Sequence, residues 1–210
     1  METPVGTSSQ DASSIASFAY EVGQLKRLPR AGWLLAGLSN TESVAEHSFR
    51  VAVLAYAIAH QEGANPERAA VLGLFHDLPE TRIGDVPSVG KPYVRTAPAH
   101  QVATDQTTQL PPELAARIVA AIDEHEGAKS PGATLEARCS RDADKLDALL
   151  QAREYQVATG NTHLQPWVTS MAEAVTTATG QALAAAAQEV DPGTWWTEFA
   201  ANFGRAVPRF

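Results

Sequence analysis

A dense group of side chains that can bind a metal or transfer a proton lies between residues 76 and 85. His76 and Asp77 follow an apolar run, and two more carboxylates, Glu80 and Asp85, come soon after. A carboxylate beside large apolar side chains is costly to bury unless hydrogen bonds or a cation compensate its charge, and a divalent metal does so directly. The neighbouring imidazole offers a neutral nitrogen ligand. Because a His-Asp pair alone can also cap a helix, its chemistry depends on what other segments bring to it.

Two predicted helices would bring a further ligand to this pair. One is predicted from about residue 41 to Gly63 and carries His47 about one turn from its start. Residues 65–67 combine a cap, a proline at the first helical position and an acid in the first turn, so a second helix begins there and delivers His76 and Asp77 at its end. Antiparallel packing would bring His47 against the pair. On its own, however, a histidine on an apolar helix is more often a core residue.

A later helix, predicted over residues 134–160, is a third source of ligands. It carries Asp142, Asp144 and Asp147 among basic residues. Three acids so close together on one helix usually form a solvated face. The apolar stripe of this helix does not decide which of the three points inward.

Apolar residues recur at helical spacing through the rest of the chain, and no strand-like alternation of useful length is found. Further helices are predicted over about 14–29, 112–127 and 168–189, and a loop rich in Gly and Pro over 81 to about 100. A chain of 210 residues can build one sizeable core. We therefore expect an all-α fold with a single helical-bundle domain.

The domain is expected to span residues 13–210. Residues 1–12 are small and polar without periodicity and predict a disordered lead. Residues 165–210 are expected to form peripheral C-terminal helices, because the segment over about 168–189 has few large apolar anchors. An aromatic patch of Trp195, Trp196, Phe199 and Phe203 must pack on the body or on a second subunit, which suggests a homodimer.

Composition limits the partners. The net charge of −8 argues against a nucleic-acid polymer or an anionic membrane as the main partner, because both need a basic face. The single Cys139 excludes an internal disulfide and favours a reducing compartment. No apolar run reaches the roughly 18 residues of a membrane span, and the first residues do not resemble a signal peptide. We expect a cytoplasmic protein with a small-molecule substrate.

One short segment of this acidic chain is basic. Arg27, Arg30 and Trp33 lie in a basic stretch over residues 26–33. Cations there could simply complement the dipole at a helix C-terminus. They could equally form a rim that binds an anion.

His47, the His76-Asp77 pair and a later helical Asp give the order H…HD…D. This order resembles the signature of the HD-domain metal-dependent phosphohydrolase superfamily. The sequence blocks around these residues resemble one branch of the superfamily more specifically, that of the 5′-deoxynucleotidases and the eukaryotic HD-domain-containing protein 2. These blocks lie at residues 23–33, 42–48, 76–80, 84–87 and 142–147, and the resemblance covers about residues 15 to 160.

The resemblance implies one divalent transition metal held by four residues, in which Asp144 occupies the family's Ala-Asp position. The implied ligands are His47, His76, Asp77 and Asp144. This mixture of nitrogen and carboxylate ligands suits Mn²⁺, Co²⁺, Fe²⁺ or Zn²⁺. The metal would activate a water and neutralise phosphate charge.

The resemblance also implies roles for the flanking residues. Glu80 matches the catalytic carboxylate, and Asp85 matches an acid that places the substrate or its leaving group. Trp33 matches an aromatic at the sugar end. The bacterial enzymes carry an Arg directly before that Trp, where this chain has Gly32. Arg30 is therefore our candidate phosphate clamp, with Arg27 behind it.

These residues imply hydrolysis of nucleoside 5′-monophosphates, particularly 2′-deoxyribonucleotides. One alternative is a two-metal HD-domain enzyme, an oxygenase or another phosphoesterase, because His100 and His125 lie between the HD pair and the last Asp. Another is a non-catalytic regulator that binds nucleotides. Intact Glu80 and Asp85 disfavour the regulator, since mere binding does not need a proton-transfer carboxylate.

Overall fold

The computed structural model describes residues 8–202 of the chain, and over this range the all-α prediction is confirmed. The described residues contain no strand beyond an isolated bridge between Pro29 and Ser43. Short 3₁₀ turns at Gly23–Lys26, Gly127–Lys129 and Thr162–Leu164 join some of the helices. The helices are α1 Ser9–Val22, α2 Ala31–Leu35, α3 Val44–Glu62, α4 Pro66–Phe75, α5 Glu80–Ile83, α6 Ala99–Thr107, α7 Pro112–Glu126, α8 Leu135–Thr159, α9 Gln165–Ala174, α10 Ala178–Glu189 and α11 Thr194–Asn202.

The start of α3 is fixed by a capping box. The Ser43 hydroxyl accepts a hydrogen bond from the Glu46 amide at 3.2 Å, and the Glu46 carboxylate accepts one from the Ser43 amide at 2.6 Å. The helix ends at Gly63, whose φ of +74° suits a residue without a Cβ. Asn65 then caps α4, with Pro66 at its first position. Local sequence therefore sets both helices on which the predicted histidines lie.

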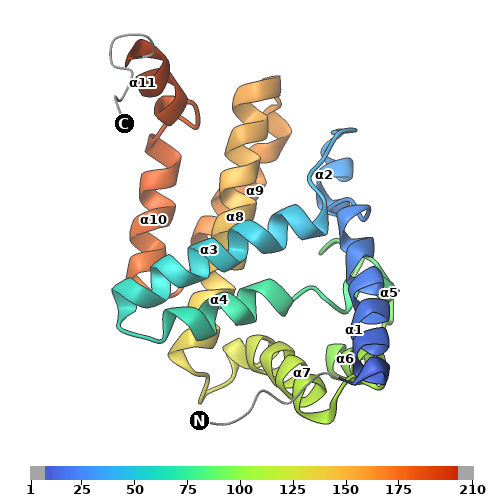
Figure 1. Cartoon of the computed structure of the whole chain (residues 1–210). Helices are drawn as coiled ribbons and strands as arrows, with labels where there is room; N and C mark the ends of the chain where they lie inside the picture. Colours follow the sequence, from blue (N-terminus) through green and yellow to red (C-terminus); the bar gives the residue numbers. More distant parts are fainter. Residues whose placement is uncertain (1–7, 203–210) are drawn as a thin grey trace.

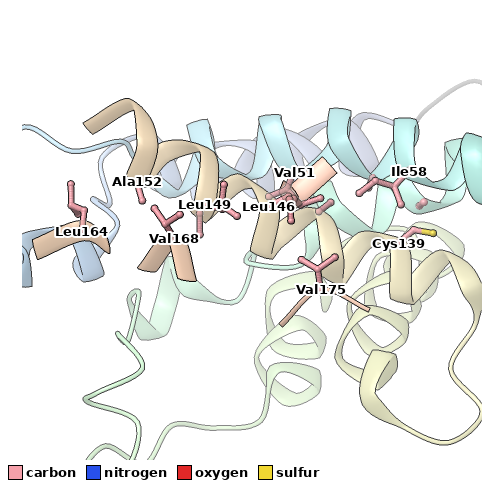
Figure 2. Packing of buried hydrophobic residues seen from close by; sticks show 14 of the residues in the cluster. Val51, Ile58, Cys139, Leu146, Leu149, Ala152, Leu164, Val168 and Val175 are labelled. Carbon is pink, nitrogen blue, oxygen red and sulfur yellow. The ribbon is translucent and has the colours of Figure 1, made fainter. Parts of the chain in front are cut away.

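The main core lies between α3, α8 and α9. Figure 1 shows α3 and α4 side by side across the centre of the molecule, and Figure 2 shows apolar side chains of α3, α8 and α9 meeting. The fully or nearly fully buried members of this cluster include Val51, Ile58, Cys139, Leu146, Leu149, Leu164 and Val168. Burying such side chains stabilises a fold by about 1.5–3 kcal/mol each. This packing holds the start of α3 and the middle of α8 against each other.

The C-terminal helices are less peripheral than predicted. Val168, Val175 and Ala184 belong to the main buried cluster. The predicted single helix over 168–189 is two helices, because the Thr176 and Thr177 amides leave the helical path to donate hydrogen bonds to the Asp142 carboxylate of α8. The small residues of α10, such as Gly180 and Ala184, let this helix pack closely against the main core instead of lying loosely at its edge.

Other predicted boundaries also differ. Residues 9–12 are the first turn of α1, capped by Ser8, rather than part of a disordered lead; residues 1–7 lie outside the described range. α1 ends at Val22 instead of near Pro29, and α2 was not predicted. The predicted loop holds α5 and the start of α6.

The aromatic patch lies on α11, beyond the end of α10 in Figure 1. Trp195, Trp196 and Phe199 are each more than half exposed. Trp195 meets Trp196 edge to face with ring centroids 5.8 Å apart, and Trp196 stacks on Phe199 at 5.5 Å. Phe203 lies outside the described residues. Among residues 8–202, no helix is both long and apolar enough to cross a membrane.

Candidate metal and phosphate site

His47 and His76 face each other at the centre of the candidate site, with ring centroids 5.3 Å apart. His47 lies in the first turn of α3 and is fully buried, and His76 directly follows α4 and is 6% exposed. The His76 Nδ1 lies 2.7 Å from the Gly73 carbonyl oxygen. A carbonyl only accepts, so Nδ1 carries a proton that it donates to Gly73, and Nε2 is the nitrogen that faces Asp77.

The second nitrogen of each ring, Nε2, is what the site offers to a ligand. His47 Nδ1 lies 2.5 Å from the Asp147 carboxylate. Among the described residues, the buried Nε2 atoms of His47 and His76 have no hydrogen-bond partner. Two orphaned imidazole nitrogens that face the same space fit a metal ion, since metal-bound histidines commonly donate their other N–H to a carboxylate or carbonyl.

Two carboxylates complete this group. Asp77 Oδ2 lies 3.2 Å from His76 Nε2 and 3.6 Å from His47 Nε2, and Asp144 Oδ1 of α8 lies 3.4 Å from His47 Nε2. Ligand atoms of His47, His76 and Asp144 lie within 4.8 Å of one another. The four residues expected as ligands therefore come together from α3, the turn after α4, and α8.

The charges in this group are strongly coupled. Burial and Arg30 lower the pKa of His47, but the nearby carboxylates of Asp144 and Asp147 raise that pKa to about 10 overall. Burial would raise the pKa of the Asp77 carboxyl, yet His76 and Arg30 hold it below its usual range. A metal that binds at His47 Nε2 would displace a proton there. Ligand binding at this site should therefore depend on pH.

Asp147 and Arg50 were not predicted as site residues, although they orient His47. Asp147 is fully buried, and its second oxygen accepts from Arg50 Nε at 2.5 Å. Arg50 also donates to Glu154 at 2.7 Å and to Gln151 at 2.9 Å. The spacing of three between Asp144 and Asp147 puts both on one helix face, and this signal could have identified the second acid.

Arg30 reaches the carboxylate cluster and pairs with two of its acids. Its Nη1 lies 3.1 Å from Asp77 Oδ2 and 3.6 Å from Asp85 Oδ1, and these carboxylates raise its pKa against the effect of burial. Asp85 also accepts from the Ala31 amide at 2.8 Å, which holds the start of α2. Backbone hydrogen bonds attach the segment before α2 to the start of α3, including Arg30 N to Glu42 O at 3.0 Å.

Arg27 and Trp33 lie differently from the prediction. Arg27 is exposed, bonds Gln24 and is not among the residues that line the cavity. Trp33 is only 3% exposed, and its Nε1 donates to the Glu42 carboxylate at 2.9 Å. It borders the cavity but is largely enclosed by its neighbours. Its aromatic ring therefore has little surface to offer a substrate.

A cavity of about 550 Å³ opens onto the cluster. This volume falls in the range of small-molecule sites. One part of its lining is charged: Arg30, Asp77, Glu80, Asp85, Lys91, Asp144 and Lys145. The rest is mainly apolar and includes residues of α9 and of the loop after α5. Lys145, whose Nζ lies 2.7 Å from Asp144, is a second cation that sequence reasoning had read only as balancing nearby acids.

Glu80, the first residue of α5, has the electrostatics of a proton donor. Burial and the charges of Asp77 and Asp85 raise its pKa to about 9. Its buried Oε2 has no hydrogen-bond partner among the described residues. This environment therefore favours the protonated carboxyl in the metal-free protein, and that proton could be transferred to a neighbouring group.

The two histidines weighed for a second metal do not join the four-residue group. His100 is 64% exposed and pairs with Asp123 at 2.9 Å. His125 is buried beside His76, with ring centroids 4.8 Å apart, and its Nδ1 lies 2.8 Å from the Ser140 hydroxyl. Burial and His76 lower the pKa of His125 to about 3. His125 is thus a neutral neighbour that packs behind His76.

Comparison with known proteins places these observations in a family. A family model described as an HD domain matches residues 22–187. The chain is 35% identical over 157 residues to the Bos taurus protein named 5′-deoxynucleotidase HDDC2, with 73% of this chain and 74% of that protein covered.

Solved structures agree in fold. A conserved hypothetical protein from Pyrococcus furiosus superposes with a TM-score of 0.66 at 27% identity, covering 83% of this chain and 99% of that one. A predicted metal-dependent phosphohydrolase from Magnetospirillum magnetotacticum superposes with a TM-score of 0.62 at 25% identity, covering 86% and 92%. This chain therefore belongs to the HD-domain family, in the branch of the curated 5′-deoxynucleotidases.

Proposed function

We propose that this chain is a metal-dependent phosphomonoesterase that hydrolyses nucleoside 5′-monophosphates, with 2′-deoxyribonucleotides preferred. One observation carries the proposal: two buried imidazole nitrogens, which have no hydrogen-bond partner in the described part of the chain, face two carboxylates at a cavity that Arg30 and Glu80 also line. The similarity to proteins named 5′-deoxynucleotidase supports the substrate class.

In this proposal His47, His76, Asp77 and Asp144 hold one divalent transition metal. The donor set of two nitrogens and two carboxylates suits Mn²⁺, Co²⁺, Fe²⁺ or Zn²⁺. When bound, the ion would supply a Lewis acid that lowers the pKa of water and offsets phosphate charge. Asp147 fixes the ring of His47 so that Nε2 lies near Asp77 and Asp144, where it would be available to the ion.

Arg30 and Lys145 bind the phosphate. Within residues 8–202, Arg30 meets the carboxylates through Nη1, so the guanidinium retains donors for a phosphate oxygen. Lys145 lines the same cavity, as does Lys91, and adds a further positive charge. Because several carboxylates crowd this cavity, a phosphate dianion needs the charges of Arg30 and Lys145 in addition to the metal. Asp85 keeps Arg30 and the start of α2 in place.

Glu80 transfers the proton. Burial and the charges of Asp77 and Asp85 raise its pKa and so favour the protonated carboxyl, which can protonate the leaving 5′-oxygen as a water oxygen replaces it on phosphorus. Such a step typically contributes about 10² to 10⁴-fold to the rate. Arg27 takes no part, since it lies away from the cavity.

Two further features belong to this proposal. The single cysteine suits a reducing compartment, so we place the chain in the cytoplasm. The exposed aromatic rings of α11 suit contact with a second copy, so we expect a homodimer. The molar mass measured by light scattering checks the homodimer.

The test is phosphate release from matched panels of deoxyribonucleoside and ribonucleoside 5′-monophosphates and their 3′ isomers. We expect turnover of the 5′ isomers, with the deoxyribonucleotides faster. Glu80→Gln should bind the nucleotide but turn it over at least about 100-fold more slowly. Equal rates for 3′ and 5′ isomers, or no release from any member with metal present, would refute the proposal.

A further inference from the structure

Trp167 on α9 forms part of the apolar wall of the cavity. Its neighbours Pro166, Ser170 and Met171 line the same wall, and three of these four side chains are apolar. The indole covers the backbone of α2, because a Cβ placed on Gly32 would stand 3.9 Å from two of its ring atoms. No residue of α9 entered the predicted site, since this segment was expected to be peripheral.

Trp167 is better placed than Trp33 to meet a substrate. The two ring centroids lie 5.8 Å apart at an angle of 42°. Trp33 is enclosed: Tyr155 packs against it at 5.6 Å, Glu42 accepts its Nε1–H, and only 3% of its surface is exposed. Trp167 packs against Trp33 but is only partly buried, and it lines the cavity. Part of its ring surface therefore remains available to a substrate.

Trp167 shares its cavity with the arginine proposed to bind the phosphate. Gly32, which the indole covers, comes two residues after Arg30, and both Arg30 and Trp167 line the cavity. With its phosphate on Arg30, a nucleoside 5′-monophosphate would bring its base to this wall.

We propose that Trp167 is the surface on which the nucleobase stacks, and that it makes the enzyme prefer nucleotides to sugar phosphates without a base. This inference rests on the proposed phosphomonoesterase function. Stacking on an aromatic side chain tolerates all bases, because every base has a π face. The wall therefore selects for the presence of a base.

The experiment compares the wild type with Trp167→Ala and Trp167→Phe on two substrates, 2′-deoxyadenosine 5′-monophosphate and 2-deoxyribose 5-phosphate. Equilibrium binding of the nucleoside 2′-deoxyadenosine is measured by calorimetry beside it. Trp195→Ala, which removes an exposed tryptophan from α11, is the matched control. Thermal unfolding of each variant shows whether the packing on Trp33 survives.

We expect Trp167→Ala to raise KM for the nucleotide about 10- to 100-fold and to weaken nucleoside binding similarly. KM for the base-free sugar phosphate should change less than threefold, Trp167→Phe should restore part of the loss, and Trp195→Ala should match the wild type. Equal losses on both substrates, or no loss on either, would overturn the stacking role while leaving the phosphatase function intact.

The two proposals fail in different ways. A wild type that turns over neither substrate, yet binds 2′-deoxyadenosine through Trp167, would refute the phosphatase function and retain the stacking surface. A wild type that turns over nothing and does not bind the nucleoside would overturn both.

Discussion

Replacing Asp147 by Asn tests how the fold orients the metal-binding imidazole. Asp147 is fully buried, accepts from His47 Nδ1 at 2.5 Å, and holds Arg50 Nε at 2.5 Å. Asn keeps the shape but removes the negative charge that both partners face. Loss of such an outer partner typically weakens metal binding 10- to 100-fold, or about 1.4 to 2.7 kcal/mol.

The same change also removes the partner of a buried charge. Breaking a buried ion pair on one side costs about 3–5 kcal/mol of folding stability. Asp147→Asn should cost about 3 kcal/mol of folding stability or less. The loss is small for a buried pair because the Arg50 side chain is 28% exposed and keeps Glu154 and Gln151 as partners. Metal affinity is measured by competition with a chelator, and stability by urea unfolding of the metal-free protein.

Asp142→Asn is the matched control. Asp142 is equally buried on α8, but it accepts from the Thr176 and Thr177 amides instead of a histidine. It should lose about 1–3 kcal/mol of stability with unchanged metal affinity. If Asp147→Asn also kept wild-type metal affinity, the claim that Asp147 orients His47 would be wrong.

Three more predictions follow from single contacts. Lys145→Met should raise KM for nucleotides about tenfold, and Lys145→Arg should recover part of it, with the metal content of both unchanged; a loss of metal instead would make Lys145 a support for Asp144. Glu80→Gln should stabilise the metal-free protein relative to wild type by an amount that grows between pH 4.5 and 9, up to about 1.4 kcal/mol per pH unit. The native carboxyl holds its proton in this interval while the unfolded one has lost it, so wild-type stability falls as pH rises; urea unfolding at several pH values would show a constant difference if this is wrong. Gly180→Ala should cost about 1–3 kcal/mol in urea unfolding, because its Cβ would come 2.5 Å from Val175; wild-type stability would mean that α10 shifts freely.

Local signals were sufficient for the elements that carry the predicted ligands. The capping box at Ser43 and the Asn65-Pro66 start are short-range hydrogen-bonding and steric effects, so α3 and α4 could be predicted closely. The motif order then placed His47 and Asp144 correctly as neighbours, although they are far apart in sequence. Periodicity alone had left open which acid of α8 faces the histidine.

The features that could not be predicted from the sequence are those that depend on tertiary packing. Helix α6 has a weak apolar pattern and is held partly by Gln106, which donates to the Leu78 carbonyl and to the Thr81 hydroxyl. Trp33 was expected at the sugar end, but the packing of Tyr155 and Trp167 encloses it. No spacing rule indicates which of two tryptophans, far apart in the chain, keeps its ring surface in a cavity.

The most direct test of the account is a metal titration of activity. Metal-stripped protein is supplied with increasing Mn²⁺ or Co²⁺, and phosphate release from a 2′-deoxyribonucleoside 5′-monophosphate is followed beside an Asp77→Ala variant. The account predicts that activity rises with the metal bound and saturates at one ion per chain, while the variant stays inactive. Activity without metal, saturation only near two ions per chain, or an active Asp77→Ala variant would contradict it.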